Sequence, residues 1–133
     1  MNNVKEFAYS RIIEKDPEYV MKELFTKLKN ESWIVLSYVD VREIIEKNSG
    51  KSFRPYYIIN VCRPQAAIEL LNENYDLGLF LPCKIVLRLR GKSTEVSLLL
   101  VSESDRNYLG GTGKTAEKYE NELETIISSI DLH

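Results

Sequence analysis

The chain has 133 residues, of which 44% are hydrophobic and 29% are charged, as is typical of one globular domain over residues 1–133. Its formal net charge of -2 at pH 7 supplies no general attraction to phosphate backbones, so we expect no nucleic-acid partner. No apolar run has the length of a signal peptide or a membrane span, and we therefore expect a cytoplasmic protein that does not contact membranes.

The first predicted elements are a strand from Val4 to Ile12 and a helix that ends near Asn30. Polar and apolar residues alternate, imperfectly, along the strand. Asp16 can cap the helix and Pro17 suits its first turn, because proline lacks an amide hydrogen that would be unpaired there. Apolar residues then recur at helical spacing.

A short strand at residues 33–38 and a short helix follow. The strand is rich in β-branched and aromatic residues. Asp40 and Glu43 have the spacing of a capping box, and Gly50 can adopt the left-handed conformation that ends a helix. The helix is therefore expected between Asp40 and Gly50.

The middle of the chain predicts a third strand over Tyr56 to Cys62, a helix that begins at Pro64, and a fourth strand over Lys84 to Arg90. Proline again stands where a helix can begin. The segment 72–78 is prone to turns and separates this helix from the fourth strand.

A two-residue turn at Gly91 and Lys92 joins the fourth strand to a fifth at Ser93 to Val101. Glycine in the first turn position suits a type II′ turn. This turn places Arg88 opposite Glu95, with the apolar pairs Leu87–Val96 and Ile85–Leu98 in the same register.

Residues 102–112 form a predicted polar loop, and an amphipathic helix from Tyr119 to Ile130 ends the chain. The order is β-α-β-α-β-α-β-β-α. We expect an α+β fold with an antiparallel sheet of about five strands and helices on one face.

Two segments resemble one known family. Residues 57–67 contain a strand that ends in Val-Cys before Arg-Pro and alanines, and residues 78–86 read Gly-Leu, two apolar residues and Pro-Cys before another strand. This pattern resembles the domain of unknown function 302 family, in which asparagine is common where this chain has Arg63. The resemblance implies an α+β fold, a homodimer and no established activity.

The two cysteines of these segments define a candidate thiol or ligand site. Cys62 precedes a helix start, where free amides and the helix dipole favour a thiolate. Cys83 begins the fourth strand, so the sulfurs share a neighbourhood if the third and fourth strands are antiparallel neighbours. Asn60, Arg63 and Pro82 flank them, and the site would take a small-molecule ligand, an oxidant or a soft metal.

The leading hypothesis is a small dimeric binding or sensing domain that uses these cysteines. The alternative is a structural or protein-interaction domain whose cysteines are inert core residues, because free cysteine is among the most buried residue types. An enzyme of unknown reaction is third. His133 is the only histidine, so a four-thiolate zinc site would require two copies of the chain, and we expect no metal or cofactor.

Two further patterns have competing interpretations. Lys84, Arg88 and Arg90 project from one side of the fourth strand, usually as a solvated face, here partly balanced by Glu95. The alternative is a shallow anion or partner site, which Tyr56, Asn60 and Cys62 join if the third strand packs beside the fourth.

The segment from Gly110 to Thr115 ends in Gly-Lys-Thr, like a phosphate-binding loop. Tyr108 occupies the position of the first glycine, however, and no strand runs directly into the loop. A connector before the last helix is therefore favoured over a nucleotide site.

Overall fold

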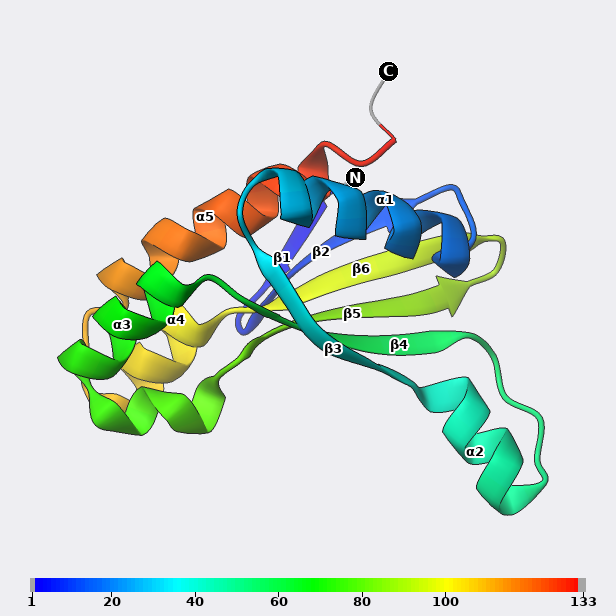
Figure 1. Ribbon diagram of the computed structural model, residues 1–133, viewed down its shortest axis with the longest axis horizontal. Coiled ribbons are helices and arrows are strands. Elements are labelled where there is room, and N and C mark those ends of the chain that lie inside the picture. The colour runs from blue at the N-terminus through cyan, green and yellow to red at the C-terminus, as the bar shows by residue number, and fades with distance from the viewer. Residues whose placement is uncertain (1, 132–133) are drawn as a thin grey trace.

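The computed structural model describes residues 2–131 and contains a six-stranded antiparallel sheet (Figure 1). The sheet order is β1-β2-β6-β5-β4-β3. The strands are β1 (Asn2–Lys5), β2 (Ala8–Ile13), β3 (Ile34–Asp40), β4 (Tyr56–Cys62), β5 (Cys83–Arg90) and β6 (Ser93–Leu99). The predicted α+β fold with an antiparallel sheet is confirmed.

The first predicted strand is in fact a hairpin. The chain reverses at Glu6 and Phe7, so that β1 and β2 pair with each other and the sheet gains a sixth strand. Neither turn residue is glycine or proline, and the alternating pattern continues through the turn. The sequence therefore gave no local indication of the reversal.

Two helices cover one face of the sheet, and the other helices lie beyond its two ends (Figure 1). The helices are α1 (Pro17–Asn30), α2 (Val41–Ser49), α3 (Pro64–Glu73), the 3₁₀ helix η1 (Tyr75–Phe80), α4 (Val101–Ser104), the π-helical turn η2 (Asp105–Leu109) and α5 (Lys114–Ser128). In Figure 1, α1 and α5 lie across the same side of the sheet, α2 projects from one end, and α3 and α4 lie at the opposite end.

The predicted starts of α1 and α2 and the predicted end of α2 are confirmed by their caps, whereas α5 begins at Lys114, before the predicted Tyr119. The Asp16 carboxylate accepts a hydrogen bond from the Tyr19 amide at 2.9 Å, and Asp40 accepts one from the Glu43 amide at 3.0 Å. Each of these bonds satisfies an amide that has no partner within the helix. Gly50 ends α2 with a φ of 71°, in the left-handed region that glycine tolerates best.

The core lies between the sheet and α1 and α5. Side chains from alternate positions of the central strands meet apolar side chains of the two helices, and the fully buried members include Leu24, Leu28, Ile59, Val61, Ile85, Leu87, Val96, Leu98, Leu123 and Ile127. Burial of each such side chain contributes roughly 1.5–3 kcal/mol. The predicted β5–β6 register, with Arg88 opposite Glu95, is confirmed.

The polar loop predicted over residues 102–112 is wrong, because α4 and η2 occupy most of it. The buried Glu120 carboxylate of α5 accepts hydrogen bonds from the Ser102 amide at 3.0 Å and from the Ser102 hydroxyl at 2.5 Å. These bonds satisfy polar groups at the start of α4. The cap comes from a residue 18 positions later in the chain, so no local pattern indicated it.

Candidate functional site

The end of β4 and the beginning of β5 lie side by side. The two strands are antiparallel neighbours, and their register pairs Val61 with Cys83. Cys62 follows Val61 directly, so the two cysteines lie near the same end of the sheet, where α3 begins. The neighbourhood expected from the sequence is therefore formed.

Cys62 and Cys83 line one cavity of about 220 Å³, called here the thiol cavity. It lies among the ends of β4 and β5, α3, and the segment 78–82. Arg63 is the one charged residue of the remaining lining. The other lining residues are Trp33, Val61, Ala66, Ala67, Leu70, Leu71, Gly78, Leu81 and Pro82. The cavity therefore favours an apolar group over an ion.

Burial disfavours the thiolate form of both cysteines. Burial raises the pKa of the partly exposed Cys62 above its ordinary value. Burial, with the Glu120 carboxylate and Cys62 nearby, raises the pKa of Cys83 to about 12. The helix start was expected to favour a thiolate at Cys62, whereas burial shifts the pKa of this thiol in the opposite direction.

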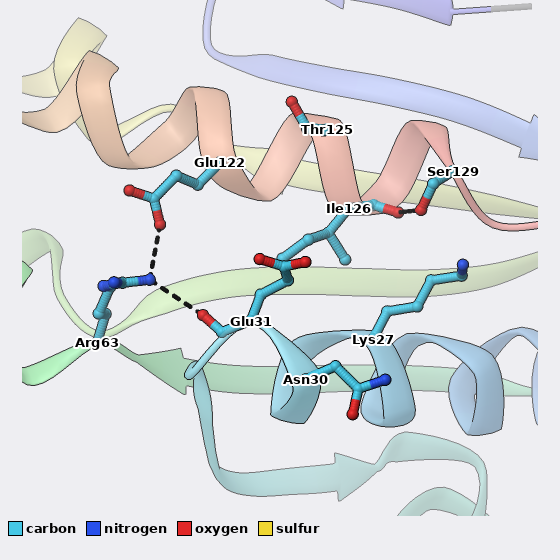
Figure 2. Close-up of a pocket in the computed structure, with 8 residues that line it drawn as sticks. All are labelled: Lys27, Asn30, Glu31, Arg63, Glu122, Thr125, Ile126 and Ser129. Atoms are coloured by element: carbon cyan, nitrogen blue, oxygen red, sulfur yellow. Dashed lines mark hydrogen bonds and ion pairs between the residues drawn. The ribbon is translucent and has the colours of Figure 1, made fainter.

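Arg63 lines both the thiol cavity and a polar groove, and within the groove it pairs with Glu122. Arg63 Nη1 donates to Glu122 Oε1 at 2.9 Å and to the Glu31 carbonyl at 3.0 Å, as Figure 2 shows. Trp33 Nε1 donates to the same Glu122 oxygen at 3.3 Å. Glu122 on α5 thus connects a residue at the start of α3 with the tryptophan that precedes β3.

The groove has a volume of about 620 Å³ and lies between α1 and α5 (Figure 2). Its lining residues are Lys27, Asn30, Glu31, Arg63, Glu122, Thr125, Ile126 and Ser129. In Figure 2, Lys27 lies at the end opposite Arg63. Two cations and two carboxylates balance each other, so the groove has no net charge with which to select an ion.

The structure divides the residues proposed from the sequence into two groups. Cys62, Cys83, Arg63 and Pro82 line the thiol cavity. Asn60 does not: its amide nitrogen donates to Ser37 Oγ at 3.1 Å, and its oxygen accepts a bond from Lys84 Nζ at 3.0 Å.

Several side chains of the cavity were not proposed as site residues. Ala66, Ala67, Leu70 and Leu71 were visible in the sequence only as the buried stripe of a helix. Trp33 was visible only as the first residue of a predicted strand. Their apolar character is the same in a closed core as around a cavity, so the sequence could not distinguish the two.

The proposed anion strip lies on the side of the sheet that α1 and α5 do not cover. Glu95 Oε1 forms ion pairs with Arg88 at 3.3 Å and with Arg90 at 2.9 Å. Tyr56 pairs with Arg88, and Asn60 with Lys84, across β4 and β5. These residues lie on the opposite side of the sheet from the core residues Ile85 and Leu87, because successive side chains of a strand alternate.

The Gly-Lys-Thr segment is built around an internal carboxylate. Gly113 precedes α5, and its amide donates to Oδ2 of the buried Asp105 at 3.1 Å. A Cβ atom at Gly111 would lie 2.3 Å from Asp105 Oδ1. Asp105 thus occupies the position beside a helix start where a bound anion would lie.

Neither a metal-binding cluster nor a membrane-spanning helix is found among the described residues. Between residues 2 and 131, no three His, Cys, Asp or Glu side chains gather as a metal site would require. None of the helices in that range is long and apolar enough to cross a membrane.

Comparison with known proteins gives a family and a related structure. The family model described as "Domain of unknown function DUF302" matches residues 9–130. A crystal structure of an uncharacterized conserved DUF302 protein from Bacillus stearothermophilus is similar, with 27% sequence identity and a TM-score of 0.85. The similarity covers 92% of this chain and 96% of that protein. No curated protein matches the chain.

Proposed function

Because the chain belongs to the DUF302 family, whose description names no activity, we propose its function from the thiol cavity: it is a binding domain for a small apolar molecule. The observation that carries this proposal is the apolar lining of the cavity where β4, β5 and α3 meet. Polar groups are few there, and pockets of this composition bind ligands mainly through burial of apolar surface.

The size of the cavity limits the ligand. An apolar protein cavity of about 150 Å³ holds benzene. The thiol cavity, at about 220 Å³, would take a substituted aromatic ring or a short branched alkyl group. A polar substituent of the ligand would extend past Arg63 toward the groove between α1 and α5, because Arg63 lines both spaces.

The state of the thiols favours an apolar ligand over a soft metal or an oxidant. Metal binding and oxidation both proceed through the thiolate. Both cysteines have raised pKa values, about 12 for Cys83. Protonated thiols instead provide weakly polar, polarisable surface, which suits contact with an apolar ring.

Toluene tests the proposal. Titration of the wild-type chain should shift the backbone amide NMR signals of Cys62, Ala66 and Leu81 saturably and should raise Tm. Ala67→Leu places a larger side chain in the cavity and should abolish both effects. Asn72→Leu adds an apolar side chain on the same helix at an exposed position outside the cavity, and it should retain them.

Two results would contradict the binding function. The first is the absence of saturable shifts in the wild-type chain at millimolar toluene. The second is equal binding by wild type and Ala67→Leu, because the toluene would then lie elsewhere.

A structural or interaction domain with inert cysteines is the second candidate. It is favoured by the burial of Cys83, which is 8% exposed. A chain that fails to bind toluene but forms a stable dimer would support it.

The homodimer and the cytoplasmic location remain predictions. Phe7, Ile12 and Ile34 are exposed apolar side chains that a second copy could cover. Light scattering at micromolar concentration should give the mass of a dimer, and a monomer would contradict this prediction.

A further inference from the structure

The side of the sheet that α1 and α5 leave uncovered has a cavity of its own, of about 230 Å³, called here the sheet cavity. Its polar wall includes Tyr56, Lys84 and Arg88, and its apolar wall includes Phe7, Val86 and Leu99. It lies across the sheet from the core and is separate from the thiol cavity, since the two share no lining residue.

The charges around this cavity are not balanced. Lys84, Arg88 and Arg90 lie along β5, and Glu95 of β6 pairs with both arginines. Lys84 bonds to the neutral side chain of Asn60. Three cations thus share one carboxylate, although the whole chain has a net charge of -2. The strip retains positive charge that can attract an anion.

Arg88 also has a donor that no protein group satisfies. Its Nη2 donates to Ser97 Oγ and lies 3.3 Å from Glu95 Oε1. Its Nε is buried and has no hydrogen-bond partner, which is true of no other buried side-chain nitrogen or oxygen among the described residues. Buried donors are normally paired, so Nε of Arg88 retains one hydrogen for a further acceptor, whereas Nη2 is already directed at Ser97 and Glu95.

The apolar wall restricts the kind of anion. Val86 lies between Lys84 and Arg88 on the same side of β5, and Phe7 and Leu99 add apolar surface. A free inorganic anion would leave this surface without a partner. An anion with an apolar body would cover it while its charged end remains near Arg88.

We propose that the sheet cavity binds a small organic carboxylate, whose charged group pairs with Arg88 and whose hydrocarbon part lies on Val86, Phe7 and Leu99. Arg88 supplies direction through its planar guanidinium, and Lys84 adds attraction. Tyr56, which faces Arg88 across β4 and β5, borders the charged end.

Hexanoate is the probe, with hexanol as its neutral counterpart of the same chain length. In the wild-type chain, hexanoate should shift the backbone amide signals of Tyr56, Val86 and Ser97 saturably, and hexanol should bind more weakly. Arg88→Met keeps the length of the side chain and should weaken hexanoate binding by about tenfold or more. Lys92→Met removes one positive charge from the exposed β5–β6 turn, outside the cavity, and should change the affinity little.

Three results would overturn the proposal. They are equal affinity for hexanoate and hexanol, equal weakening by Lys92→Met and Arg88→Met, and wild-type shifts that map to the thiol cavity instead of the sheet cavity. The wild-type map is decisive even if Arg88→Met fails to fold.

Discussion

Cys83 of β5 pairs with Val61 of β4, and not with Cys62, which is the next residue along β4. Consecutive residues of a strand direct their side chains to opposite faces, so the register does not aim the two Cβ atoms at each other as a disulfide requires. The cysteines can share a cavity without forming a redox pair.

The first prediction concerns thiol reactivity. A disulfide-exchange reagent such as dithionitrobenzoate should modify Cys62 slowly and Cys83 hardly at all in the native chain at neutral pH, because burial raises the pKa of both. The rate at Cys62 should rise with pH as the thiolate forms. Cys62→Ala and Cys83→Ala identify which thiol reacts, and both should react in denaturant. Rapid native modification of Cys83 would contradict the burial described above.

The second prediction concerns the link between Arg63 and Glu122. Their side chains are 33% and 38% exposed, so solvent weakens the pair, and we expect a coupling of about 0.2–1 kcal/mol in a double-mutant cycle. Each single variant also loses a second contact, because Arg63 donates to the Glu31 carbonyl and Glu122 accepts from Trp33, so only the cycle isolates the pair. Urea unfolding of the two single variants and the double variant measures the coupling, and added salt should reduce it.

The third prediction concerns pH and the buried Glu120. Burial raises the pKa of this carboxyl from 4.5 to about 7. Between these pH values the folded chain binds more protons than the unfolded chain, so the free energy of unfolding should fall as pH rises, by roughly 3 kcal/mol at most. The contribution is complete below pH 4.5 and lost above about pH 7.

Urea titrations across this range should show that Glu120→Gln removes the slope relative to wild type. Glu14→Gln is the control, because Glu14 is exposed. A slope that persists in Glu120→Gln would assign the effect to another group.

The fourth prediction compares neighbouring glycines. Gly111→Ala would place Cβ 2.3 Å from Asp105 Oδ1 and should destabilise the fold by more than about 2 kcal/mol, since a buried carboxylate must move. Gly110→Ala meets open space, but Gly110 has a φ of 72°, so this change should cost only about 1 kcal/mol. Thermal unfolding ranks the two, and the reverse order would show that the connector does not depend on Asp105.

Much of the fold could be predicted because its determinants are local. Asp16 and Asp40 cap helices with amides three residues ahead, and Gly50 ends a helix by its own conformation. The charge pair Arg88–Glu95 and the apolar pairs beside it indicate one hairpin register, which the structure has. The turn at Glu6 and Phe7 and the start of α4 have no such local mark.

The candidate site was less predictable because tertiary contacts determine its properties. Antiparallel pairing was enough to bring Cys62 and Cys83 to one end of the sheet. The direction of their pKa shifts depends on how much solvent the surrounding helices remove, and the helix dipole alone suggested the opposite. Glu122 contacts Trp33 across 89 positions of the chain, so its role could not be inferred from neighbours in sequence.

The position of Trp33 gives the protein an intrinsic optical probe. It is the only tryptophan of the chain, it lines the thiol cavity, and its indole nitrogen donates to Glu122. Indole fluorescence responds to the polarity and hydrogen bonding around the ring, so a molecule that enters the cavity should change the emission of the unlabelled chain. Compound libraries can therefore be screened for ligands of this cavity by fluorescence alone.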